Sequence, residues 1–352
     1  MEINDFLSKK ILGFKSTLPA MILADHFSMR PDMARNYSEH QKEKFQKDVA
    51  WILSFLAQSV WAGQPVLFEE FASWLKTFLT SVKVPMKDVA ESLELIKKRI
   101  NQECTAEENE LINPLLDKAI RLILTEGQKL SLPALDNHLT TLAQNYLESL
   151  LTGNRSNALS IIMNEVAAGI PVRDMYLQVF QPVQYEIGRL WQTNRISVAQ
   201  EHYCTGATQL VMSQLYPYLF TGEKKDRKMV TTCVPGELHE MGARMVTDFF
   251  EMHGWDTYYL GANMPIEGVI NFLIDIKPRF LAISATMTFH VSAVEEMISR
   301  IRSATGIPSD LKIMVGGYPF KVAEGLWKRV GADGYALDAL EAVDLADKLL
   351  AA

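Results

Sequence analysis

The chain has 352 residues, of which 48% are hydrophobic and 22% charged, and its net charge is −7. This length exceeds that of one ordinary domain, and the composition excludes a disordered or collagen-like chain. The acidic balance disfavours a general nucleic-acid binder. The three widely spaced cysteines form no CxxC pair, which excludes a disulfide framework and a zinc ribbon.

The start of the chain carries acidic residues, Glu2 and Asp5, where a signal peptide carries basic ones. No apolar run approaches the roughly 20 residues that a membrane-spanning helix needs. We therefore expect a reduced, cytoplasmic protein without a membrane anchor.

Residues 3–126 show apolar side chains at helical spacing and no strand-like alternation. The spacing produces two apolar stripes: Val49, Trp51, Ile52, Phe55 and Leu56, and Phe68, Phe71, Trp74, Leu75 and Phe78. Pro65 and Pro85 stand near expected helix starts, where a missing N–H costs little. Residues 1–130 are therefore predicted to form an all-helical domain.

Residues 131–222 are predicted to form a four-helix bundle. The apolar pattern gives helices at 135–151, 157–168, 172–192 and 196–219. Asn154 or Ser156 can cap the second helix, and Pro182 is expected to kink the third. The short connections favour antiparallel neighbours.

A polar, charged run at 221–228 marks a linker, and the pattern then alternates between strand and helix up to residue 352. Strands are expected at 229–234, 255–260, 280–284, 313–315 and 334–336. Helices are expected between them, at 320–330 for example, and at the end of the chain. Such alternation predicts a doubly wound parallel sheet, Rossmann-like or flavodoxin-like, over residues 223–352. Ligands of these sheets bind beyond the carboxyl ends of the strands.

The loop after the first predicted strand contains Glu237, Leu238, His239 and Gly242. A carboxylate near an imidazole can hold one ring nitrogen, which fixes the tautomer and leaves the other nitrogen for a metal. A glycine leaves room for a bulky ligand against the backbone. An exposed histidine at a helix start is the alternative interpretation.

Ser284 and Thr286 follow the third predicted strand, and Gly316 and Gly317 follow the fourth. Hydroxyls and paired glycines at strand ends suit a ligand tail that runs along the edge of a sheet. Each pair by itself is also compatible with a plain turn.

Together these residues resemble the cobalamin-binding module, whose pattern is D-x-H-x-x-G, then S-x-L, then G-G. The chain departs from it at Glu237, which replaces Asp, and at Thr286, which replaces Leu. The resemblance implies that His239 is the lower axial ligand of cobalt and that Glu237 holds it. It also implies that Ser284 bonds the base of the nucleotide tail and that the glycine pair makes room for the tail.

The predicted bundle resembles the cap of corrinoid carrier proteins and of adenosylcobalamin photoreceptors. The photoreceptors carry Trp, nine residues, then Glu-His, which matches Trp191, Glu201 and His202. The resemblance implies that Trp191 packs over an adenosyl group and that Glu201 accepts hydrogen bonds from ribose hydroxyls. Bundle core and a polar helix face are the alternative roles. Gln192 stands where known photoreceptors have a second axial histidine.

The N-terminal domain loosely resembles globin-like sensor domains, which in the photocobilins precede a cobalamin unit and bind a bilin. Aromatic residues that can line such a pocket are Trp51, Trp61, Phe68, Phe71 and Trp74. His26 or His40 can bond the propionates or lactam of biliverdin or another bilin. A purely structural aromatic core is the alternative.

These resemblances lead us to expect a light sensor with adenosylcobalamin, with a bilin as an optional second chromophore. The alternative is a methyl-carrying corrinoid protein of a methyltransferase system. The pattern of a mutase barrel is not found in the sequence. We expect a signalling protein rather than an enzyme, which forms a homo-oligomer or acts on a separate protein effector, and which binds neither DNA nor membrane.

Overall fold

The computed structural model describes residues 2–125, 138–220 and 223–351. The predicted domain boundary near residue 130, and residues 221–222 of the predicted linker, lie outside these ranges. The chain divides into two compact units. The first unit comprises residues 1–127, 285–300 and 316–332, and the second comprises 128–284, 301–315 and 333–352. Within the described ranges, no helix is long and apolar enough to cross a membrane.

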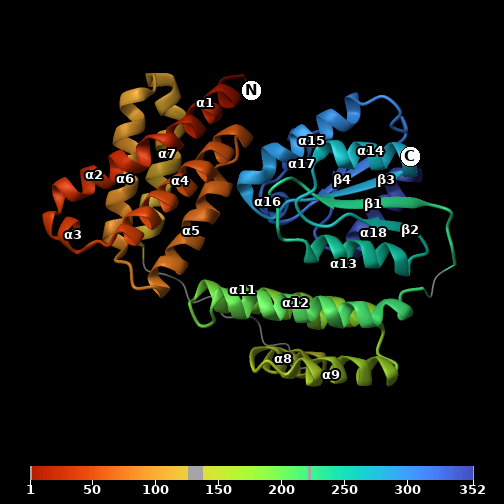
Figure 1. Cartoon of the computed structure of the whole chain (residues 1–352). Helices are drawn as coiled ribbons and strands as arrows, with labels where there is room; N and C mark the ends of the chain where they lie inside the picture. The colour runs from red at the N-terminus through yellow and green to blue at the C-terminus, as the bar shows by residue number, and fades with distance from the viewer. Residues whose placement is uncertain (1, 126–137, 221–222, 352) are drawn as a thin grey trace. The chain divides into compact units, whose positions relative to one another are not determined.

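The N-terminal segment is helical, as the sequence predicts (Figure 1). Its α-helices are α1 (Glu2–Gly13), α2 (Leu18–Met29), α3 (Pro31–Asn36), α4 (Glu39–Ala62), α5 (Pro65–Ser81), α6 (Met86–Glu103) and α7 (Ala106–Leu124). Capping boxes at Ser38 and Thr105 fix the starts of α4 and α7. Pro65 is the first residue of α5 and Pro85 directly precedes α6, where neither ring removes a needed hydrogen bond.

Aromatic rings stack through the core of this helical segment. The Phe55 and Phe71 rings lie 3.9 Å apart at 13°, and Phe71, Trp74 and Phe78 continue the stack. Trp51, predicted to lie in an apolar stripe, is instead 48% exposed. Helical spacing correctly predicts which side of α4 is buried, but it does not predict how far around the helix the buried side extends.

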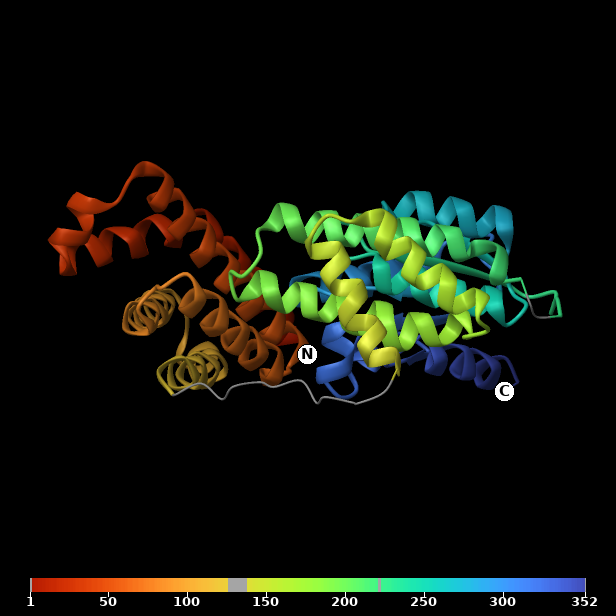
Figure 2. The ribbon, with the colours of Figure 1, turned by 90° about the horizontal axis from the view of Figure 1, so that it is seen from below.

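The bundle has four antiparallel helical segments, which Figure 2 shows from below. They are α8 (His138–Leu151), α9 (Arg155–Ala167), a third segment of α10 (Val172–Met175), a π-turn (Tyr176–Phe180) and α11 (Gln181–Gln192), and α12 (Val198–Leu215). Of the two predicted caps, Asn154 is the one that accepts the helix N–H, from Asn157 at 3.1 Å. In the third helix, where a kink is predicted at Pro182, a π-turn ends at Phe180, two residues before the proline.

The C-terminal part contains a five-stranded parallel sheet in the order β2-β1-β3-β4-β5. The strands are β1 (Lys228–Cys233), β2 (Asp256–Tyr259), β3 (Phe280–Ser284), β4 (Lys312–Gly316) and β5 (Gly334–Tyr335). The helices are α13 (Met241–Met252), α14 (Ile266–Ile276), α15 (Val291–Ser303), α16 (Tyr318–Val322), α17 (Leu326–Arg329) and α18 (Ala339–Ala351). The predicted flavodoxin-like order, with its switch point between β1 and β3, is thus observed.

One predicted helix of this region is wrong. The segment 320–330 forms two short helices, α16 and α17, in place of one. The break falls at Ala323, whose backbone is extended, and at Gly325, whose φ of +74° is left-handed. An apolar run that contains a glycine does not reveal by itself that the glycine leaves the helical region.

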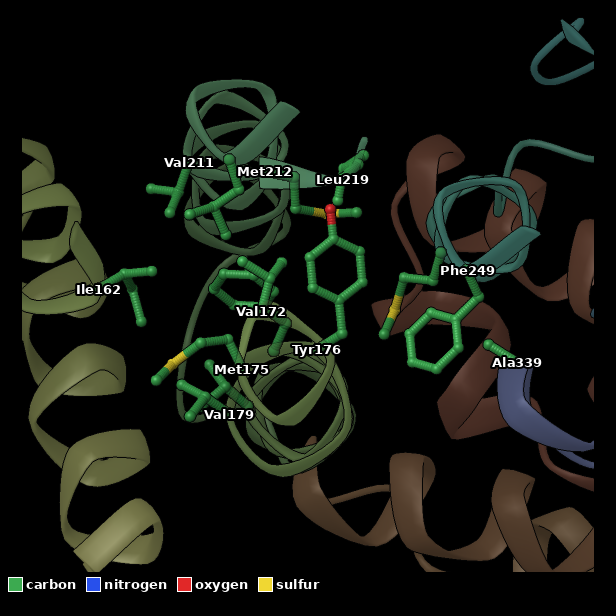
Figure 3. Close-up of a cluster of buried hydrophobic side chains, with 14 of the residues drawn as sticks. Ile162, Val172, Met175, Tyr176, Val179, Val211, Met212, Leu219, Phe249 and Ala339 are labelled. Atoms are coloured by element: carbon green, nitrogen blue, oxygen red, sulfur yellow. The ribbon is translucent and has the colours of Figure 1, made fainter. Parts of the chain in front are cut away.

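The bundle and the sheet share one hydrophobic core in the second unit. Figure 3 shows Tyr176 of the π-turn between bundle side chains, such as Met175, and Phe249 of α13. The Tyr176 hydroxyl donates a hydrogen bond of 2.7 Å to the buried Asp248 carboxyl, also on α13. This shared core fixes α13, and with it the loop that precedes α13, against the bundle.

Candidate functional site

The loop between β1 and α13 presents a histidine held by a buried carboxylate. His239 Nδ1 lies 2.5 Å from Glu237 Oε1, and the His239 backbone N–H donates to the same oxygen at 3.0 Å. The Glu237 side chain is fully buried, whereas 59% of the His239 side chain is exposed. A carboxylate on Nδ1 fixes the ring and leaves Nε2 directed outward, as a metal-ligating imidazole requires.

Charge on the bundle also reaches this imidazole. The hydrogen bond to Glu237 raises the pKa of His239, burial opposes this, and the Glu201 carboxylate of α12 raises it further. Helix α12 also touches the His239 loop directly, because the Gln209 side chain donates a hydrogen bond of 3.1 Å to the Glu240 carboxylate. The helix that carries the predicted upper residue Glu201 thus contacts the lower-ligand loop inside the second unit.

Glu201 is bonded to neighbouring residues of its own helix, α12. Its carboxylate lies 2.5 Å from Nδ1 of the exposed His202 and accepts a hydrogen bond of 3.0 Å from Thr205. Trp191, at the end of α11, is half-buried and packs against the core of the second unit. The core role of this tryptophan, the alternative to a ligand contact, is thus real in part.

At the ends of the central strands, Ser284 of β3 stands opposite Cys233 of β1 in the sheet register. Ser284 is half-buried, and burial raises the pKa of the Cys233 thiol to about 12. This cysteine is therefore a neutral, packed side chain at pH 7. Ser284 is the polar side chain opposite it, and its hydrogen bond to the Cys233 thiol acts against the effect of burial on that pKa.

Thr286, Gly316 and Gly317 form a second group, which belongs to the first unit. The Gly316 carbonyl accepts a hydrogen bond of 3.1 Å from the Ala285 N–H. Gly317 has φ +108° and ψ 172°, and a Cβ there would lie 2.0 Å from the Ala285 carbonyl oxygen. Only glycine fits this position, so Gly317 is first of all a requirement of the loop itself.

The residues near His239 fit a corrin. Leu238 is 72% exposed, and among the described residues a Cβ built on Gly242 would meet no atom within 4 Å apart from those of its chain neighbours and the backbone of its own helix. Across 2–125, 138–220 and 223–351 there is no cluster of three or more His, Cys, Asp or Glu side chains that could hold a free metal ion. A corrin brings its cobalt already bound by ring nitrogens, so one outward imidazole is sufficient.

Sequence reasoning missed several polar residues around this loop. Glu240 and Asn263 form hydrogen bonds between the His239 loop and the loop after β2. The Thr231 hydroxyl in β1 is buried and finds no hydrogen-bond partner within the described ranges. Thr231 and Thr232, in the middle of a strand that is predicted to be buried, could have pointed to this site, because a buried hydroxyl needs a hydrogen-bond partner.

In the N-terminal helices the predicted bilin residues are divided between core and surface. His26 is buried, with Nε2 2.8 Å from the Ser92 hydroxyl, while His40 is exposed. The predicted aromatic residues that are buried are Trp61, Phe68 and Phe71. The structural alternative therefore accounts for most of these residues.

Two family models match the chain between residues 142 and 344. Residues 227–344 match a B12 binding domain, and residues 142–216 match a second model with the same description. The comparisons support a cobalamin-binding protein. The predicted cobalamin-binding sheet and its bundle are thereby confirmed at that level, and the roles of the individual site residues remain predictions. Residues 23–123 match the model of a phycobilisome protein.

Relatives of this cobalamin-binding protein include both predicted groups. The HTH-type transcriptional repressor CarH of Myxococcus xanthus is 26% identical over 53% of this chain and 62% of its own length. Dimethylamine corrinoid protein 2 of Methanosarcina mazei is 32% identical over 36% of this chain and 58% of its own length. The chain thus spans about three fifths of each. The structure of the Methanosarcina barkeri monomethylamine corrinoid protein has the same fold (TM-score 0.53, 23% identity, 59% of this chain and 98% of that one).

Proposed function

We propose that this cobalamin-binding protein is a light sensor that holds adenosylcobalamin between the bundle and the loop of His239. One observation carries the proposal. The Trp191, Glu201 and His202 signature stands on α11 and α12, and α12 bonds the His239 loop through the Gln209 side chain and the Glu240 carboxylate. The helix that carries Glu201, proposed for the upper face of a corrin, therefore contacts the loop proposed for the lower face. The similarity to a CarH repressor supports the same function.

In this proposal His239 Nε2 ligates cobalt from below, and Glu237 fixes the ring through Nδ1. Trp191 packs on the adenosyl group, and Glu201 accepts hydrogen bonds from its ribose. When bound, adenosylcobalamin supplies a cobalt–carbon bond that visible light breaks. Trp191 and Glu201 would lose these contacts once that bond is broken, and the preferred position of α11 and α12 would then change. That shift would be read by a protein effector or by a subunit interface of a homo-oligomer.

The test is an absorption spectrum of protein supplied with adenosylcobalamin, recorded in the dark and after green light. Parent protein is expected to show a bound cobalt–carbon spectrum that bleaches. In competition binding it is expected to prefer adenosylcobalamin to methylcobalamin, and Trp191→Ala is expected to lose this preference. Tyr216→Ala, which removes an exposed aromatic ring beyond the end of α12, is the matched control and should retain it. Equal or tighter binding of methylcobalamin by the parent would refute the proposal.

A methyl-carrying corrinoid protein is the second candidate. The 32% identity to a dimethylamine corrinoid protein favours it, as does the shared fold of the monomethylamine protein. A carrier must expose the upper face of the corrin to partner enzymes, which a Trp191 cap would hinder. Preference for methylcobalamin together with an unchanged spectrum after illumination would establish this candidate.

A bilin as second chromophore is the remaining part of the proposal, and it would make the N-terminal helices a globin-like sensor domain. The phycobilisome match over residues 23–123 supports it. Because His26 is enclosed by the core, exposed His40 is the histidine that we propose for a bilin propionate. Protein produced with biliverdin should show an absorption band in the red that His40→Ala weakens. Absence of any such band in the parent would leave a sensor with cobalamin alone.

A further inference from the structure

Glu240, directly after the proposed cobalt ligand, accepts hydrogen bonds from three different segments. Its Oε2 accepts from the Tyr259 hydroxyl and from the Ala262 N–H, each at 3.0 Å. Its Oε1 accepts from the Gln209 side chain of α12 at 3.1 Å. A half-buried carboxylate with three donors is held in one orientation, since each bond to a charged group is stronger than a neutral one.

The same neighbouring loop also holds the backbone ahead of His239. Asn263 accepts a hydrogen bond from the Gly236 N–H at 2.7 Å through Oδ1, and its own N–H donates to the Glu237 carbonyl at 2.9 Å. Asn263 has a φ of +52°, a left-handed conformation that asparagine tolerates better than most residues. The segment 261–263 thus holds the His239 loop at both of its ends, through Gly236 and Glu237 on one side and Glu240 on the other.

Helix α12 connects this network to the upper side of the site. Glu201, Thr205 and Gln209 are spaced four residues apart and therefore share one face of α12. Glu201 is the proposed adenosyl-binding carboxylate, and Gln209 bonds Glu240 roughly 12 Å further along the helix. A helix moves as a rigid rod over this length, so displacement of Glu201 also displaces Gln209.

We propose that Glu240 is a positioning residue that sets His239 for cobalt and couples it to the cap helix α12 through Gln209. A change at the upper face would then alter how firmly the lower ligand is held. This inference rests on the proposed function, because it takes His239 as the ligand and Glu201 as the contact of the upper group.

The first experiment measures lower ligation directly. Full-length protein is reconstituted with cob(II)alamin, and electron paramagnetic resonance reports the nitrogen splitting from the axial imidazole. Glu240→Ala should lower the fraction of protein with this splitting and weaken adenosylcobalamin binding at least about 10-fold, as loss of a residue that orients a metal ligand does. Glu240→Gln retains acceptors for Tyr259 and Ala262 and should recover most of both properties. In cofactor-free protein, hydrogen exchange of residues 234–240 should rise in Glu240→Ala and less in Glu240→Gln.

The second experiment tests the coupling with a double-mutant cycle. Gln209→Ala should weaken adenosylcobalamin binding in the parent and have no effect in Glu240→Ala. The matched control is Ser213→Ala, which removes a different contact of α12 with α13, the 2.9 Å bond from Arg244. Its effect should be the same in both backgrounds.

The outcomes separate this inference from the proposed function. Parent protein without nitrogen splitting from His239 would overturn the ligand assignment, and this inference with it. Parent protein with splitting, but a Glu240→Ala variant equal to it in splitting and affinity, would overturn the positioning role alone. If Gln209→Ala weakens adenosylcobalamin binding by the same factor in the parent and in Glu240→Ala, the proposed coupling would be overturned.

Discussion

Replacing Asp248 with Asn tests whether a buried carboxyl between bundle and sheet makes the second unit sensitive to pH. Burial, with a smaller effect from Glu251, raises the pKa of Asp248 from its ordinary 3.8 to about 6. The Tyr176 hydrogen bond and Arg244 act in the opposite direction. The folded protein therefore favours the neutral carboxyl. Its contribution to stability is complete below pH 3.8 and is lost as the pH rises through 6.

The expected magnitude follows from that difference in pKa. A gap from 3.8 to about 6 corresponds to about 3 kcal/mol, most of which falls between pH 4 and pH 7. Asn at this position retains an oxygen that can accept the Tyr176 hydrogen bond but cannot become charged. Relative to Asp248→Asn, the parent should thus lose roughly 2 to 3 kcal/mol of unfolding free energy between pH 4 and pH 7.

The change in unfolding free energy of the second unit alone is measured by hydrogen exchange of peptides from 241–252, corrected for the intrinsic effect of pH. That choice matters because a chain of several units does not unfold in one two-state step. Asp344→Asn, an exposed aspartate of α18, is the matched control and should leave the pH profile unchanged. Tyr176→Phe removes the hydrogen bond that lowers the pKa of Asp248, so it should make the profile steeper.

Two results would refute this reasoning. A free-energy difference between parent and Asp248→Asn that does not vary with pH would mean that the carboxyl is not perturbed in the folded state. A parent that gains stability relative to Asn as the pH rises would mean that the ion pair with Arg244, 4.0 Å away, outweighs burial.

Three further predictions concern the sites themselves. Gly317→Ala should destabilise the protein by about 1–3 kcal/mol, because alanine rarely adopts a φ of +108° and its Cβ would meet the Ala285 carbonyl. Urea unfolding measures this loss of stability, and an unchanged unfolding midpoint would contradict the prediction. His239→Ala should lose the axial nitrogen, giving a base-off cobalamin spectrum and at least about 10-fold weaker binding, and an unaltered spectrum would remove His239 from the cobalt site. Burial lowers the pKa of His26, and its Nδ1 has no hydrogen-bond partner within the described residues, so protonation favours unfolding. The N-terminal helices should therefore lose stability as the pH falls below 6.5. Hydrogen exchange of peptides from 18–29 should show a smaller loss in His26→Gln than in the parent. Equal losses in both proteins would mean that His26 is not the group responsible.

The sheet could be predicted because its information is local. Each strand is a short apolar run between polar turns, and the alternation with helices leaves one class of topology. The same locality explains the error at 320–330. Whether Gly325 continues a helix or turns into the left-handed region depends on what surrounds it, and a single sequence does not contain that.

The N-terminal helices show a different limit. The pattern that predicts helices also assigns Trp51 and Phe71 equally well to a core or to a pocket. In the structure Phe71 is stacked in the core and Trp51 is 48% exposed. Periodicity gives the face of a helix but not what covers it, and that depends on how neighbouring helices pack.

Glu237 and Glu240 mark the corresponding limit at the candidate site. Glu237 could be predicted because its partner, His239, is two residues away, within the reach of one loop. The donors to Glu240 come from α12, β2 and the loop after β2, and Gln209 and Ala262 are 53 residues apart in the chain. Only the folded sheet brings them to one carboxylate. A motif found by local spacing therefore identifies the group that contacts a cofactor, whereas the residues that hold this group against a moving cap are found in the tertiary structure.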